Sequence, residues 1–206
     1  MAAGVKVKIN LKKVLRRIQK PTKKLEVKVR KKAELILKKA KEKLIKEFEA
    51  HPVTQEIRGG PSAGNPSRTL GGYGNLWSYI GFSSSSPDPT DIVSKTLKND
   101  IKLNKTPKVQ SFKTKIEYRF KINTVDLPRL ETMTPMPWES GRSWLRGVER
   151  GISGFSNYMY GKTGGRSGMA FQTKGAIRAG GFGNVKYMSE ILKNFKKDLK
   201  AKKGAK

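Results

Sequence analysis

The chain has 206 residues, no cysteine and a formal net charge of +29. The absence of cysteine excludes disulfides and thiolate chemistry, and no apolar run approaches the roughly 20 residues that a membrane span requires. The charge must be neutralised by partners, and nucleic acid is the default partner of such a chain, ahead of an anionic membrane surface or acidic proteins. The hydrophobic fraction of 35% predicts a modest core with arms or loops.

The N-terminal segment alternates apolar and polar residues over 5–11, which is the period of a strand. The apolar residues then switch to helical spacing and predict a short helix that ends at Pro21. Its other face is basic, and we expect it to contact nucleic acid or a partner through Lys12, Lys13, Arg16, Arg17 and Lys20.

A long amphipathic helix is predicted over Thr22–Ala50, between Pro21 and Pro52. One face carries the apolar stripe Leu25, Val29, Ala33, Ile36, Ala40, Leu44 and Phe48. Pairs with the acid first are expected at Glu26–Arg30, Glu34–Lys38 and Glu42–Lys46. The stripe needs a sheet or another helix, and the lysine-covered face either stays in water or meets something anionic.

The segment 51–82 is rich in glycine and proline and is predicted to be a long loop held by contacts. Its far end, Leu76–Phe82, has the aromatic composition of a strand. Such a loop can reach a neighbouring copy, so contacts between copies are expected at Tyr73, Trp77, Tyr79 and Phe82, and also at Trp138 and Trp144.

A short helix is predicted over Thr90–Lys98, and a strand over Phe112–Ile122. The strand alternates over its whole length, so its apolar face, Phe112, Thr114, Ile116, Tyr118, Phe120 and Ile122, should be buried under the long helix. The other face should be wet and mostly basic, and we expect Lys113, Lys115 and Arg119 to contact nucleic acid or a partner.

The rest of the chain is predicted as loops and two helices, over Ser143–Gly151 and Val185–Lys200, with a short strand over 169–174 and a turn over 180–184. The order of elements predicts an α+β fold: an antiparallel sheet packed by the long helix and the C-terminal helix, with long Gly/Pro-rich loops and basic termini. We expect one domain over residues 1–200 with extended loops at 51–75, 83–111 and 128–168, and a basic tail over 201–206.

No residue pattern predicts catalysis, a cofactor or a metal site, so we expect the protein not to be an enzyme. Gly161-Lys162-Thr163 resembles the end of a phosphate loop but lacks the earlier glycine and the following helix. The sole histidine, His51, has no cysteine or second histidine beside it and is expected to cap a helix end. Asp88, Asp91, Glu131 and Glu139 are interpreted as caps or solvated loop residues.

Positive charge is concentrated at the two ends of the chain, with a net +13 over residues 1–50 (18 basic, 5 acidic) and +6 over 193–206 (7 basic, 1 acidic). This distribution is typical of proteins whose arms lie on a polyanion. We expect Lys196 and Lys197 on the C-terminal helix to take part in such contacts.

The segment Val5–Ile18, the break at Pro21 and the long basic helix resemble the start of the tail-completion (neck, head–tail joining) proteins of tailed bacteriophages. The segments 51–57, 71–82 and 137–145 are similar to loop-and-strand segments of virion proteins of this kind. The resemblance implies a small α+β fold and a ring between the head connector and the tail, through which DNA passes. It implies a structural virion protein, assembled in the host cytoplasm, whose partners are its own copies, portal or adaptor proteins and tail proteins.

Two other hypotheses stay open. A nucleic-acid-binding module, such as a ribosome-associated or DNA-packaging basic protein, explains the charge equally well but not the long Gly/Pro/aromatic loops. An enzyme acting on nucleic acid would need a site that the sequence does not show. Closed rings favour the neck protein, whereas a monomer with salt-sensitive nucleic-acid affinity favours the binding module.

Overall fold

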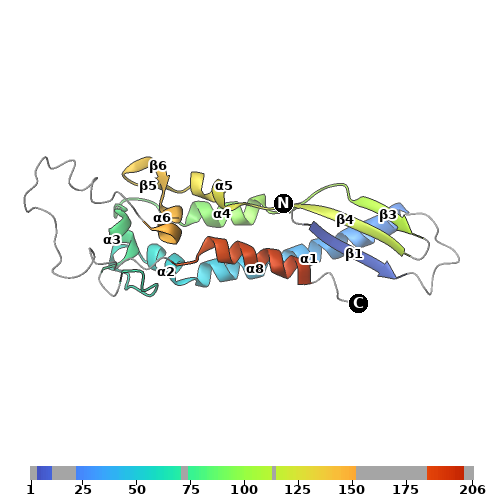
Figure 1. Cartoon of the computed structure of the whole chain (residues 1–206), viewed down its shortest axis with the longest axis horizontal. Helices are drawn as coiled ribbons and strands as arrows, with labels where there is room; N and C mark the ends of the chain where they lie inside the picture. The colour runs from blue at the N-terminus through green and yellow to red at the C-terminus, as the bar shows by residue number, and fades with distance from the viewer. Residues whose placement is uncertain (1–3, 11–21, 71–73, 113–114, 152–184, 202–206) are drawn as a thin grey trace, which may run out of the picture. The chain divides into compact units, whose positions relative to one another are not determined.

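The computed structural model describes residues 4–10, 22–70, 74–112, 115–151 and 185–201 (Figure 1). The chain divides into two compact units. Unit 1 comprises residues 1–47, 94–126 and 191–206, and unit 2 comprises residues 48–93 and 127–190. The long helix belongs to both units, since its apolar stripe contributes Leu44 to unit 1 and Phe48 to unit 2. One domain over residues 1–200 stays a prediction.

The long helix is confirmed as α1, Lys23–Ala50, with 28 residues and therefore a length of about 42 Å. Its predicted stripe is buried at Val29, Ala33, Ala40, Leu44 and Phe48, each at most 4% exposed. Thr22 precedes the helix, and its hydroxyl accepts a hydrogen bond from the Leu25 amide at 3.3 Å, which satisfies one of the unpaired amides of the first turn.

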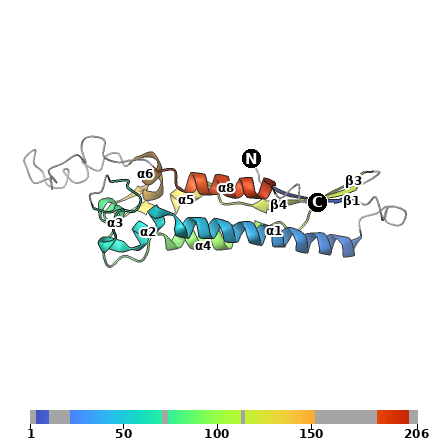
Figure 2. The ribbon, with the colours of Figure 1, turned by 90° about the horizontal axis from the view of Figure 1, so that it is seen from below.

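The sheet of unit 1 is antiparallel and centred on β4, Lys115–Asn123. β1, Gly4–Asn10, pairs with one side of β4, and β2, Lys102–Leu103, and β3, Lys108–Phe112, pair with it as well. α1 runs along one face of this sheet (Figures 1 and 2). Ile116, Tyr118, Phe120 and Ile122 are at most 3% exposed, as their alternation predicted.

The strand predicted over Phe112–Ile122 is wrong at its start. Phe112 is the last residue of β3 and lies opposite Lys115 of β4, so the chain reverses between them. Phe112 is 48% exposed, and the prediction that it is buried is therefore also wrong. Apolar–polar alternation continues through the reversal, and nothing in the period marks the end of one strand and the start of the next.

Two more helices contribute to unit 1. α4, Asp91–Asp100, confirms the helix predicted from residue 90, and it contributes Leu97 to the core. α8, Met188–Ala201, confirms the C-terminal helix and lies beside α1 (Figures 1 and 2). Its buried face within this unit consists of Ile191, Leu192, Phe195 and Leu199.

Unit 2 begins with short helices where the sequence predicted a loop: α2, Pro52–Arg58, the 3-10 turn η1, Gly60–Ser62, and α3, Leu76–Ile80. Pro52 does end α1, but it also occupies the first turn of α2, where its missing N–H costs nothing. The strand predicted over Leu76–Phe82 is wrong. Asn75 caps α3 by accepting from the Ser78 amide at 2.9 Å, and Gly81 ends it in the left-handed conformation with φ +89°.

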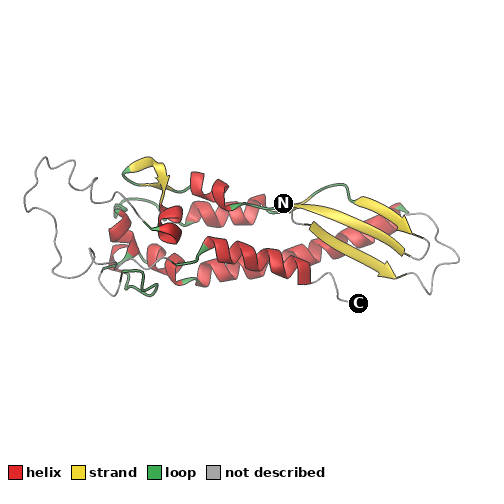
Figure 3. Ribbon diagram, viewed as in Figure 1, coloured by secondary structure: helices red, strands yellow, loops and turns green. Residues whose placement is uncertain are grey.

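The second half of unit 2 holds α5, Leu127–Thr132, the strands β5, Pro135–Met136, and β6, Glu139–Ser143, and α6, Trp144–Arg150 (Figure 3). α6 confirms the helix predicted over Ser143–Gly151, and Ser143 caps it by accepting from the Arg146 amide at 3.2 Å. The prediction of an extended loop is therefore wrong at the start of 128–168, where α5, β5 and β6 lie. It is also wrong for the part of 83–111 that forms β2 and β3.

The α+β fold class is confirmed, with antiparallel sheets and a long helix packed with the C-terminal one. The predicted basic helix before Pro21, the glycine-rich segment 154–168, the strand 169–174, the turn 180–184 and the tail after residue 201 lie outside the described residues.

Candidate nucleic-acid interface

A row of lysines follows the face of α1 opposite the buried stripe. It consists of the exposed residues Lys24, Lys28, Lys31, Lys39 and Lys46, which follow one another at steps of four, three, eight and seven residues and cover about 33 Å of helix. None of them makes an ion pair with a described carboxylate. Leu35, 59% exposed, is the apolar residue in this row. The lysine row therefore presents five exposed cations that make no ion pair with a described carboxylate, with Glu42 as an acidic residue on the same face.

The acidic residues of α1 neutralise other cations. Arg30 Nε lies 2.9 Å from Glu34 Oε1, and Lys38 Nζ lies 3.9 Å from Glu42 Oε1. The predicted pairs Glu34–Lys38 and Glu42–Lys46 are thus wrong, because each of these two carboxylates contacts the cation four residues before it, and Arg30 pairs with Glu34 rather than with the predicted Glu26. Arg30 also donates to the carbonyl of Lys105, which fixes it toward the β2–β3 connection. Glu34 and Glu42 are thus paired with Arg30 and Lys38, although Glu42 lies on the face of the lysine row, three residues after Lys39 and four before Lys46.

Further acidic side chains are engaged in contacts between α1 and α8. Lys43 Nζ lies 2.8 Å from Asp198 Oδ2, and this hydrogen bond and charge raise the pKa of Lys43 above its ordinary value. Asn194 donates to Glu47 at 2.6 Å. On the exposed side of α8, Lys193, Lys197 and Lys200 remain without a described carboxylate partner.

A second basic surface lies on the sheet face that α1 does not cover. Arg119 and Lys121 of β4 are exposed there, and the register places Lys6 of β1 and Lys108 of β3 on either side of Arg119. Glu117 is the exception to the predicted wet face, since it is 1% exposed and its Oε2 lies 3.3 Å from Arg119 Nη2. This carboxylate orients the guanidinium, whose side chain stays 49% exposed.

The predicted contact residues are distributed as follows. Lys12, Lys13, Arg16, Arg17, Lys20 and Lys113 lie outside the described residues, as does Tyr73. Lys115 and Arg119 lie on β4, and Lys196 and Lys197 lie on α8, all within unit 1. The lysine row was not among the predicted contacts, although its helical spacing and its surplus over nearby carboxylates were both visible in the sequence.

The aromatic residues predicted to contact a neighbouring copy pack within unit 2 instead. Trp77 and Trp144 are 5% and 1% exposed, so their side chains have little surface left for a neighbouring copy. Phe82 joins them, with ring centroids 5.2 Å from Trp77 and 6.2 Å from Trp144. Trp138 donates its Nε1–H to the carbonyl of Ile80 at 2.9 Å. Tyr79, Phe82 and Trp138 are half-buried, and for them contact between copies stays a prediction.

The carboxylates considered for catalysis have structural partners. Asp88 Oδ2 lies 3.0 Å from Arg58 Nε, and its Oδ1 accepts from the amide and hydroxyl of Thr90 ahead of α4. His51 caps a helix, as expected, but at the start of α2: its Nδ1 accepts from the Val53 amide at 3.2 Å. Among the described residues, no group of three His, Cys, Asp or Glu side chains could hold a metal ion.

Comparisons with protein-family models, with curated proteins and with solved structures found no match to this chain. In the part of the chain that the structure describes, no helix is both long and apolar enough to cross a bilayer.

Proposed function

We propose that this protein is a structural, non-catalytic subunit of a tailed-phage virion, a neck or tail-completion protein that forms a ring around or near the passage for DNA. The resemblance of its N-terminal segments to that family supplies the setting. The observation that carries the proposal is the lysine row of α1, which offers five exposed cations over about 33 Å, none of them in an ion pair with a described carboxylate.

Duplex DNA carries about one negative charge per 1.7 Å of its axis, so a linear array of lysines gains favourable contacts with successive phosphates. Such contacts release counterions and require no base recognition. The outer face of the sheet, with Arg119 and Lys121, provides a second surface of the same chemistry. Both surfaces suit a subunit that lies against DNA without binding one sequence.

The test is a salt titration of duplex-DNA affinity, measured by fluorescence anisotropy with the full chain. The double variant Lys28→Gln/Lys31→Gln removes two charges from the lysine row, and Arg68→Gln/Lys186→Gln removes two exposed charges from unit 2. Because each phosphate contact contributes about 0.9 to the logarithmic salt slope, the first variant should lower the slope by about 2. An equal decrease of the salt slope in the second variant would mean that DNA is attracted diffusely by the whole protein, and it would reject the lysine row as the interface.

The alternative is a nucleic-acid-binding module outside a virion. The same net charge supports it, and it predicts the same salt titration. It differs in predicting a monomer, both free and on nucleic acid, so the mass of the particle in solution separates the two functions.

A further inference from the structure

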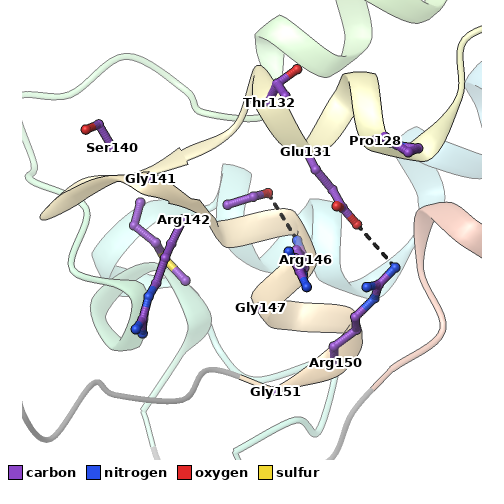
Figure 4. A pocket seen from close by; sticks show the side chains of 12 residues that line it. Pro128, Glu131, Thr132, Ser140, Gly141, Arg142, Arg146, Gly147, Arg150 and Gly151 are labelled. Atoms are coloured by element: carbon purple, nitrogen blue, oxygen red, sulfur yellow. Dashed lines mark hydrogen bonds and ion pairs between the residues drawn. The ribbon is translucent and has the colours of Figure 1, made fainter.

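Unit 2 contains a cleft of about 690 Å³ between α5, the β5–β6 hairpin and α6 (Figure 4). Arginines supply most of its charged lining: Arg142 comes from β6, and Arg146 and Arg150 come from successive turns of α6. Glu131 reaches in from α5, and Pro128 and Met136 are the apolar members of the lining. A volume of this size lies within the range of roughly 300–1,000 Å³ that is typical of ligand sites.

The α6 sequence explains why its arginines face the cleft. Trp144, Leu145 and Val148 are at most 1% exposed and fix the buried side of the helix. Arg146 and Arg150 are four residues apart, so they lie together on the other side. Gly147, between them, carries no side chain that would fill the space.

The cleft already pairs guanidinium groups with carboxylates at its edges. Arg150 Nη2 lies 3.7 Å from Glu131 Oε1, and Arg142 Nε lies 3.1 Å from Glu139 Oε2. Arg146 also lines the cleft, and its guanidinium has no partner among the described residues. The hydrogen bond from Arg146 to Ser143 is made by the backbone amide. A bound carboxylate would therefore meet one guanidinium without a described partner, in a lining that also contains Arg142 and Arg150.

We propose that this cleft binds an acidic, extended segment of a partner protein, with a carboxylate of that segment on Arg146. Guanidinium groups bind carboxylates through two parallel N–H···O bonds, and Met136 and Pro128 can pack against the aliphatic part of an acidic side chain. A second copy of this chain is a poor occupant because its net charge is +29. A DNA duplex is too wide to enter a cleft of about 690 Å³ and could contact only its rim. The proposal does not rest on the proposed function, because it uses a different surface in the other unit.

The test is fluorescence anisotropy of the full chain with a fluorescein-labelled peptide of alternating glutamate and serine, at physiological salt, beside a glutamine–serine peptide. Arg146→Gln should weaken binding of the glutamate peptide about tenfold, the typical loss for one charge-assisted bond. Arg146→Lys keeps the charge but loses the two parallel N–H···O bonds, so its affinity for the glutamate peptide should lie between those of the wild type and Arg146→Gln. Arg68→Gln removes one exposed charge from unit 2 outside the cleft and should change affinity less than about twofold.

Three results would overturn the proposal. The first is equal binding of the glutamate and glutamine peptides. The second is an equal loss in Arg146→Gln and Arg68→Gln, which would mean unspecific attraction to a basic protein. The third is a loss of single-stranded DNA affinity in Arg146→Gln with peptide affinity unchanged, which would make nucleic acid the occupant. Because Arg146 is exposed, none of these variants is expected to unfold the chain, and thermal unfolding of each would verify this.

Discussion

Replacing Glu56 with glutamine should loosen the connection between α2 and α3. Glu56 is fully buried on α2, and its Oε1 and Oε2 accept from the backbone amides of Leu76 at 2.7 Å and Ser67 at 3.1 Å. One carboxylate therefore fixes two points of the chain that are 11 and 20 residues away. The amide of glutamine can satisfy only one of these donors, and its NH₂ group would face the other.

The expected cost is at least about 2.5 kcal/mol, since a bond to a charged group contributes about 1.5–3 kcal/mol and a buried unpaired N–H costs about 1–3 kcal/mol. The assay is urea unfolding followed by tryptophan fluorescence. All three tryptophans, Trp77, Trp138 and Trp144, lie in unit 2, so the signal reports on the unit that contains Glu56. Trypsin cleavage after Arg68 should also become faster, because this residue lies within the segment that Glu56 anchors.

The matched control is Glu190→Gln, which removes an exposed carboxylate from the same unit and should change the free energy of unfolding by less than about 0.5 kcal/mol. If Glu56→Gln is as stable as this control, the two hydrogen bonds do not anchor the segment and the reasoning is refuted.

Two further predictions concern the same unit. Burial raises the pKa of Tyr187. The contribution of this group to the free energy of unfolding should therefore be complete below pH 10 and fall above it by up to about 1.4 kcal/mol per pH unit, because the unfolded state loses the proton first. In urea unfolding from pH 9 to 11, the free energy of unfolding should fall less steeply with pH for Tyr187→Phe than for the wild type, and an equally steep fall would contradict the assignment. Gly81→Ala should destabilise unit 2 by about 1–2 kcal/mol, because φ at this position is +89° and the new Cβ would lie 3.4 Å from Trp138; the same fluorescence assay measures it, and Gly141→Ala, where a Cβ meets nothing within 4 Å, is its control.

Among the elements that the sequence predicted correctly, which include the short helices α4 and α6, those with long, regular periods also showed which face is buried. α1 and α8 carry apolar stripes over several turns, and the alternation of β4 identifies its buried face at Ile116, Tyr118 and Phe120. In each case the pattern itself reflects the surface against which the element packs, so the packing can be inferred without knowing the partner.

The incorrect predictions concern short segments whose structure depends on one or two residues. Leu76–Ile80 has the composition of a strand, but Asn75 and Gly81 provide helix ends that outweigh five residues of weak β preference. The β3–β4 reversal leaves the alternation intact, so the two strands read as one. The burial of Glu56 depends on amides that are distant in sequence, and no local pattern predicts it.

Of the two candidate sites, one could be predicted from the sequence and the other could not. The lysine row of α1 follows from helical spacing and was visible in the sequence, whereas the arginine cleft was not. Its lining residues come from segments that were mostly read as loop, and only the turn between β5 and β6 brings Glu131 and Met136 near α6. Contacts between copies depend on surfaces of a second chain, which no single sequence pattern describes.

The most direct test of the central claim is electron microscopy of the purified full chain, with and without linear duplex DNA. The account predicts closed rings of identical subunits, with DNA against the lysine row of α1. Single subunits under both conditions, with no assembly on DNA, would contradict it.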